Sequence, residues 1–136
     1  MKVVLDTSAL IASFAKNSPF RPIYSALLAG KYELAVSTEI LLEYAEKIGE
    51  KTTPSISHNL TELLTVLPNV RLKKIFYNWH IIFNDPDDNK FVDCYIAAGA
   101  DYLVSNDRHF SVLKPDDFPP VQVIGMEAFM EVLAGL

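Results

Sequence analysis

Short runs of consecutive apolar residues alternate along the chain with longer segments in which apolar residues recur every three or four positions. The short runs are typical of buried parallel strands, and the longer segments of helices with one apolar face. We expect strands at residues 2–5, 34–36, 81–83, 102–105 and 121–124. We expect helices at residues 9–14, 23–29 and 55–67, and further helices that begin after Ser37 or Thr38, at Pro86 and after Gly125. This alternation predicts a three-layer α/β/α fold with a central parallel sheet and right-handed crossovers.

Length and composition narrow the class of protein. With 136 residues, half of them hydrophobic, the chain suits a single domain over residues 1–136. It has no apolar run of about 18 residues, so we expect no membrane segment. Cys94 is the only cysteine, which excludes an internal disulfide, predicts a buried thiol and favours the cytoplasm. The formal net charge of −5 argues against a general nucleic-acid coat.

Aspartates stand at the ends of two expected strands. Asp6 directly follows residues 2–5, and Asp107 follows residues 102–105 with one residue between. The carboxyl ends of parallel strands lie at one edge of a sheet, where open α/β sheets bind ligands. Helix capping is the simpler role for Asp6. Thr7 and Ser8 are likewise able either to cap the next helix or to hydrogen-bond the acids.

Further acids lie at the start of the helix expected at Pro86. Asp85 suits the N-cap of this helix, because proline is favoured at the first helical position. At ~100° per residue, Asp88 falls on the apolar stripe, Asp93 beside small apolar residues, and Asp87 towards solvent. Acids at a helix start also interact favourably with the helix dipole, and this simpler explanation stays open.

The helix after Ser37 carries glutamates at positions 39, 43, 46 and 50, on the side opposite its apolar residues and on the flank. A solvated acidic face explains most of them. Spacing alone does not distinguish Glu43 from the others.

Carboxylates that meet at one sheet edge would have raised, coupled pKa values without a cation. A hard divalent ion removes that penalty, and Mg²⁺ or Mn²⁺ prefers carboxylate and water oxygens. No spacing of histidine and cysteine suggests zinc instead. Such ions can polarise a phosphoryl oxygen, activate water and stabilise a leaving oxygen, so the pattern favours phosphodiester hydrolysis.

Four segments of the chain carry a family resemblance. They are V-L-D-T-S-A-L at 4–10, S-T-E-I-L-L-E-Y at 37–44, D-P-D-D-N-K-F-V-D-C-Y-I-A-A at 85–98 and A-D-Y-L-V-S-N-D-R-H-F at 100–110. With these segments the chain resembles the PIN domain, in particular the branch of toxins from toxin–antitoxin systems. The segments span nearly the whole chain, and residues 52–80 match least well.

The resemblance implies a metal-dependent endoribonuclease with a parallel sheet of order 3-2-1-4-5, an RNA substrate, an antitoxin partner and a homodimer. It assigns catalytic acids and metal ligands to Asp6, Glu43, Asp88 and Asp107, and a supporting hydroxyl to Ser105. The family pattern D-x-x-I-A-A also falls on Asp93, so Asp88 and Asp93 compete for, or share, the role on the helix. Asp85 is at most an outer member. Asp6 and Asp107 are expected to hold the principal metal ion.

Several side chains are candidates for holding RNA. They are the basic residues Arg108, Lys90, Arg71, Lys73 and Lys74. A solvated surface charge is the simpler explanation for each of them. Trp79 and His80 either contact nucleic acid or simply pack against the protein.

Three other classes of protein are alternatives to a nuclease. A phosphatase of the haloacid-dehalogenase type also starts with a strand that ends in aspartate, but it needs a second acid where this chain has Ser8. A Rossmann nucleotide binder needs a glycine-rich phosphate loop, and none lies beside Asp6. The third class, a PIN-like binding or assembly module without catalysis, stays open.

Overall fold

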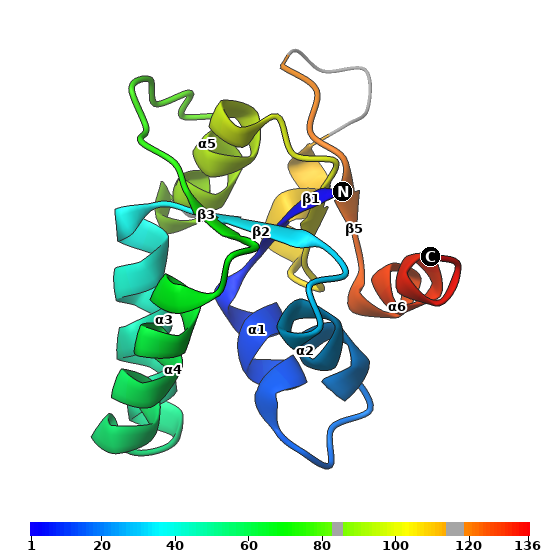
Figure 1. Cartoon of the computed structure of the whole chain (residues 1–136). Helices are drawn as coiled ribbons and strands as arrows, with labels where there is room; N and C mark the ends of the chain where they lie inside the picture. The colour runs from blue at the N-terminus through cyan, green and yellow to red at the C-terminus, as the bar shows by residue number, and fades with distance from the viewer. Residues whose placement is uncertain (83–85, 114–118) are drawn as a thin grey trace.

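The computed structural model of the protein describes residues 1–82, 86–113 and 119–136. Five parallel strands form one sheet in the order β3-β2-β1-β4-β5, flanked by helices (Figure 1). The strands are β1 (Lys2–Leu5), β2 (Glu33–Val36), β3 (Val70–Leu72), β4 (Tyr102–Val104) and β5 (Val123–Ile124). The helices are α1 (Thr7–Phe14), α2 (Arg21–Leu28), α3 (Thr38–Lys51), α4 (Pro54–Val66), α5 (Asn89–Ala98) and α6 (Met126–Ala134), with short 3₁₀ helices η1 (Pro86–Asp88) and η2 (Arg108–Val112). The predicted fold class and strand order are confirmed.

The third strand is not where the sequence pattern placed it. It is β3 (Val70–Leu72), whereas Ile81 and Ile82 belong to no strand, and Phe83 lies outside the described residues. Ile82 is buried in the core, but the side chain of Asn89 satisfies its backbone: the N–H donates to Oδ1 and the C=O accepts from Nδ2, both at 2.8 Å. The apolar run therefore reflects burial without sheet pairing. As an edge strand with two exposed residues, β3 has only a weak apolar signature.

The helix that carries the acids begins later than predicted. Residues 86–88 form η1, and α5 starts only at Asn89, so Asp88 stands before the helix rather than on its apolar stripe. The expected cap, Asp85, lies outside the described residues. Gly99 ends α5 in the left-handed conformation with φ of 63°, which glycine adopts without steric cost. The next strand then follows at once.

The centre of the sheet lies within the hydrophobic core. Val3, Val4 and Leu5 of β1 are all fully buried, and the Tyr44 hydroxyl donates to the Leu5 carbonyl at 2.5 Å. This bond fastens α3 to the carboxyl end of β1, where the acids lie. Cys94 is a buried free thiol, as predicted, and its burial raises the thiol pKa to about 12. Among the described residues, the helices are too short or too polar to cross a membrane.

Candidate active site

The carboxyl ends of β1 and β4 bring Asp6 and Ser105 together. Leu5 pairs with Val104 in the parallel register, and the Asp6 N–H donates to the Val104 carbonyl at 3.1 Å. The Ser105 hydroxyl donates to Asp6 Oδ2 and accepts from the Asp107 N–H at 2.9 Å. Ser105 thus links the carboxylate of Asp6 to the backbone of Asp107.

Asp6 is both the N-cap of α1 and a buried acid with a raised pKa. Its Oδ1 accepts from the Ala9 N–H at 2.7 Å and caps α1, so Asp6, and neither Thr7 nor Ser8, is the N-cap residue. Burial raises the pKa of Asp6 to about 6, and the charges of Asp107 and Asp88 act in the same direction. The hydrogen bonds from Ser105 and Ala9 oppose this rise. Asp6 is therefore a carboxylate whose charged form would be stabilised by a nearby cation.

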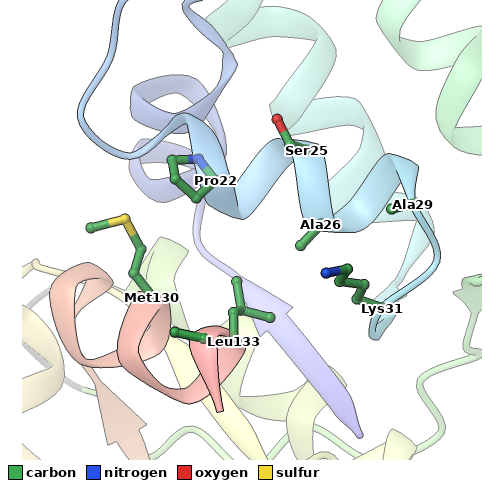
Figure 2. A pocket seen from close by; sticks show the side chains of 8 residues that line it. Pro22, Ser25, Ala26, Ala29, Lys31, Met130 and Leu133 are labelled. Atoms are coloured by element: carbon green, nitrogen blue, oxygen red, sulfur yellow. The ribbon is translucent and has the colours of Figure 1, made fainter. Parts of the chain in front are cut away.

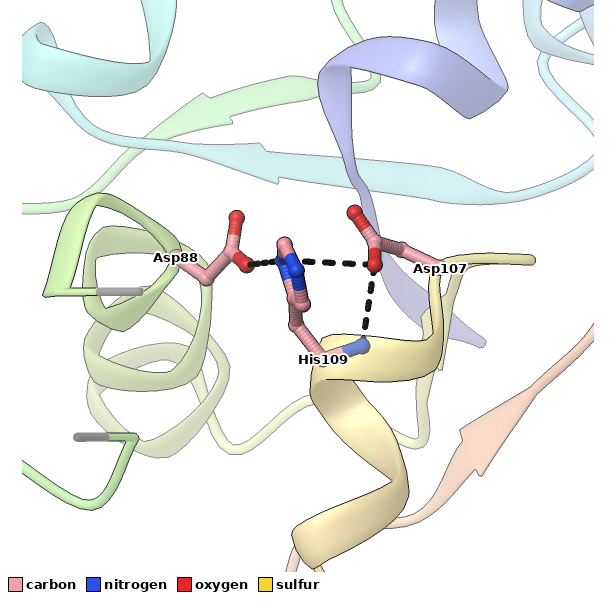
Figure 3. A group of neighbouring side chains, drawn as sticks. All are labelled: Asp88, Asp107 and His109. Atoms are coloured by element: carbon pink, nitrogen blue, oxygen red, sulfur yellow. Dashed lines mark hydrogen bonds and ion pairs between the residues drawn. The ribbon is translucent and has the colours of Figure 1, made fainter. Parts of the chain in front are cut away.

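Asp88, Asp107 and His109 form a tight group (Figure 3), and the charges of Asp107 and Asp88 act on Asp6. One potential ligand atom from each residue lies within 4.8 Å of the other two. His109 Nδ1 is 2.9 Å from Asp88 Oδ2 and 3.3 Å from Asp107 Oδ1. The imidazole thus lies between two carboxylates that come from η1 and from the end of β4.

The sequence reasoning missed His109. It stands two residues after Asp107, and Asp107 caps η2 by accepting from the His109 N–H at 2.9 Å. This turn directs the imidazole towards Asp88 (Figure 3). The short spacing between Asp107 and His109 in an N-D-R-H segment was the available signal. A single histidine beside an aspartate is not a zinc pattern, which needs several histidines or cysteines at defined spacings.

Glu43 lies near this group but is held by other partners. It accepts from the Thr7 hydroxyl at Oε2 and pairs through Oε1 with Lys90 Nζ at 2.8 Å. Thr7 directly follows Asp6, so this contact joins Glu43 to the strand end that carries the buried acid. Thr7 is buried, whereas Ser8 is exposed and faces away from the core.

Among the described residues, Asp93 lies outside the group of Asp88, Asp107 and His109. It is buried, and its Oδ1 accepts from the Trp79 N–H at 2.9 Å. Burial raises its pKa, and the bond from Trp79 opposes the rise. The charge that acts on Asp93 from α3 is that of Glu39, whereas Asp6 feels Asp107 and Asp88. The structure thus brings together Asp6, Asp88 and Asp107 and places Asp93 against a different segment.

The basic residues that are candidates for holding RNA differ in whether an acid already pairs with them. Arg108 is exposed next to Asp107. Lys90 is paired with Glu43, and Arg71 Nη2 lies 3.4 Å from Glu33 Oε1 at the surface. Of the three, Arg108 is best placed to meet a phosphate beside the acids.

The donors of this group fit a divalent cation. Carboxylate oxygens of Asp88 and Asp107 are the ligands that Mg²⁺ and Mn²⁺ prefer, and the imidazole of His109 adds a nitrogen that transition-metal ions accept.

A separate apolar pocket of about 510 Å³ lies between α2 and α6 (Figure 2). No acid lines it, so it offers no comparable set of ligands.

A parallel sheet of this order with acids at the carboxyl ends of its central strands describes a class of α/β nuclease-like domains. The sequence matches the model of the PIN domain over residues 2–109, and the chain belongs to the PIN domain family. Membership of this family indicates a nuclease. No curated protein sequence matches the chain.

Two solved structures have a similar fold. One is VapBC2 from Rickettsia felis bound to a DNA fragment from the promoter, with a TM-score of 0.64 and 15% identity over 92% of this chain and 98% of the other. The other is VapBC-1 from nontypeable Haemophilus influenzae, with a TM-score of 0.59 and 16% identity over 93% of this chain and 99% of the other. At these identities the likeness concerns the fold.

Proposed function

We propose that residues 1–136 act as one Mg²⁺- or Mn²⁺-dependent endoribonuclease domain, the toxin of a toxin–antitoxin pair. The observation that carries this proposal is the convergence of Asp6, Asp88 and Asp107 from three separate segments. Their mutual repulsion and the burial of Asp6 are unfavourable unless a cation or a proton compensates. A nuclease that works through divalent ions needs such a cluster of acids. A protein in which these acids had only a structural role would not.

A bound divalent ion would polarise the phosphoryl oxygen and lower the pKa of the attacking water. Asp6, Asp88, Asp107 and His109 would hold it. The Ser105 hydroxyl bonds to the Asp6 carboxylate and to the Asp107 backbone N–H, and so it ties together the two segments that carry these aspartates. Glu43, fixed by Thr7 and Lys90, is available to orient the attacking water.

The role as a toxin rests on family membership and on the four resembling segments. The likeness in fold to VapBC2 and VapBC-1 supports it. On this proposal the substrate is RNA, the protein works in the cytoplasm, and its partners are an antitoxin and a second copy of the chain.

RNA cleavage by the purified protein tests the proposal. We expect cleavage with Mg²⁺ or Mn²⁺, none with a chelator, and loss of cleavage in Asp6→Asn and Asp107→Asn. Asp87→Asn is the matched control, because Asp87 is an exposed acid next to Asp88. Folded Asp6→Asn and Asp107→Asn variants that cleave RNA as well as the parent would refute the assignment.

One observation favours the second candidate, a binding module without catalysis. Lys90 pairs with Glu43, and the protonated form of His109, between Asp88 and Asp107, would offset the charge of both acids. On this reading no metal is needed. Titration calorimetry separates the two, because a module of this kind would take up no Mn²⁺ at the acids.

A further inference from the structure

Two neighbouring aromatic side chains stand out into solvent on residues 73–80, which we call the aromatic segment. Phe76 is 90% exposed and Tyr77 is 64% exposed. Among the described residues these are the only aromatic side chains with such exposure. The Tyr77 ring also contacts that of Trp79, with centroids 4.7 Å apart. Single exposed apolar residues are common, but adjacent exposed rings mark a binding surface.

The same segment carries positive charge in an acidic protein. Lys73 and Lys74 directly precede the aromatic residues, whereas the whole chain has a net charge of −5. Within the part of the chain that the structure describes, neither lysine has an acidic partner at ion-pair distance. Arg71, two residues earlier, already pairs with Glu33. The two lysines are thus the free positive charges next to the rings.

The aromatic segment leaves the sheet at the edge that carries the acids. It continues from the carboxyl end of β3, where the Lys73 N–H donates to the Val36 carbonyl at 2.7 Å. Since the strands are parallel, this edge also bears Asp6 and Asp107. At about 4.8 Å between neighbouring strands, β3 lies roughly 10 Å from β1. A nucleic-acid strand that crosses this edge from β4 to β3 would meet both the acids and the aromatic segment.

The segment has no regular secondary structure, but it is anchored to α5. The Trp79 N–H bonds to Asp93, and just beyond the segment both backbone groups of Ile82 bond to Asn89. Ile75 packs against the core. His80 adopts a φ of 51°, a left-handed conformation that non-glycine residues rarely adopt and that is enriched at functional sites. Phe76 and Tyr77 therefore lie between two anchored residues, Ile75 and Trp79, on the stretch of chain that leads from β3 towards α5 (Figure 1).

We propose that the aromatic segment binds single-stranded RNA, with unpaired bases stacked on Phe76 and Tyr77 and phosphates held by Lys73 and Lys74. Aromatic rings beside lysines are the usual means of holding single strands without sequence preference. The lysines favour this ligand over an apolar protein surface, which would leave their charges unmatched. The inference rests on the proposed function, since it names the form of RNA that reaches the acids.

The chain contains its own reporter for this site. Trp79 is the only tryptophan, and its ring touches that of Tyr77. We would titrate the full chain carrying Asp107→Asn, which is expected not to cleave, with a short oligouridine, whose bases are largely unstacked. The same strand annealed to oligoadenosine serves as the duplex. We expect the single strand to quench Trp79 fluorescence and the duplex to bind at least about tenfold more weakly, because its bases are already stacked.

Matched variants locate the contacts. Phe76→Ala with Tyr77→Ala is expected to weaken binding by at least about tenfold. Val66→Ala, at a position 74% exposed on α4, is expected to leave binding unchanged. Lys73→Gln with Lys74→Gln should reduce the slope of log affinity against log salt by about 1.4, at roughly 0.7 for each phosphate contact. Lys16→Gln with Lys51→Gln, also exposed, is the charge control.

The outcomes separate this inference from the proposed function. If the parent chain cleaves RNA but Phe76→Ala with Tyr77→Ala binds and cleaves it normally, the stacking site is wrong and the nuclease stands. If the single strand binds and quenches Trp79 fluorescence but the parent chain does not cleave RNA, the stacking site stands and the nuclease assignment is wrong. If the double variant alters only self-association in sedimentation, the rings form a protein interface and the inference is overturned.

Discussion

The Ser105 hydroxyl donates a hydrogen bond to the carboxylate of Asp6, a residue 99 positions away in the chain. The bond joins the carboxyl ends of β4 and β1, which are neighbours in the sheet. It stabilises the charged form of a carboxylate that burial disfavours. The behaviour of Asp6 and its neighbours leads to four predictions.

The first prediction concerns stability without metal. Burial raises the pKa of Asp6 in the folded protein from its ordinary value of 3.8 to about 6. Between these values the folded state binds more protons than the unfolded state, so the free energy of unfolding falls as pH rises from about 4 to 6. This loss amounts to roughly 3 kcal/mol. Asp6→Asn keeps a side-chain oxygen for the cap and should be more stable than the parent at pH 7.5.

Urea unfolding in a chelator at pH 4.5 and 7.5 measures this effect. Asp101→Asn is the control, because Asp101 is an exposed acid that accepts a bond from the Lys2 N–H. A parent protein that gains stability over Asp6→Asn between the two pH values would contradict the raised pKa of Asp6.

The second prediction concerns Ser105. Ser105→Ala removes the bond that lowers the pKa of Asp6 and also leaves the Asp107 N–H without its acceptor. We expect the acidic limb of the pH profile of cleavage to move to higher pH. A shift of one pH unit corresponds to about a tenfold lower cleavage rate at any given pH on that limb. Ser105→Thr keeps the hydroxyl and should restore the profile. A uniform loss at every pH would indicate a purely structural role for Ser105.

The third prediction distinguishes two acids that the sequence left as alternatives. Asp88 belongs to the group with Asp107, whereas Asp93 bonds to the Trp79 backbone. We expect Asp88→Asn to reduce cleavage on the order of 100-fold, and Asp93→Asn, which still offers an acceptor to Trp79, to change it only slightly. Steady-state cleavage rates measure both. Equal losses would mean that Asp93 also serves the metal site.

The fourth prediction concerns metal preference. An imidazole ligand favours Mn²⁺ over Mg²⁺, because Mg²⁺ is selective for oxygen. His109→Ala should therefore weaken Mn²⁺ binding on the order of tenfold and Mg²⁺ binding less, as measured by titration calorimetry. His58→Ala is the control, since His58 is an exposed histidine on α4 paired with Glu62. Losses of the same size for both ions would exclude His109 as a ligand.

The sequence by itself determined the elements whose signals are local. Buried runs marked β1, β2 and β4, Ser37 capped α3, and the alternation of strands with helices fixed the class of fold. Asp6 and Asp107 were found because residues at the carboxyl ends of parallel strands share one edge whatever the side-chain packing.

Only the tertiary structure decided the rest. The backbone of Ile82 bonds to the Asn89 side chain instead of to a neighbouring strand. Asp88 belongs to η1, before α5, and contacts His109. Both outcomes depend on side-chain contacts between segments that are separate in the chain, and a periodic pattern carries no record of such contacts. The division between Asp88 and Asp93 likewise rests on such contacts, since Asp88 meets His109 whereas Asp93 meets the Trp79 backbone.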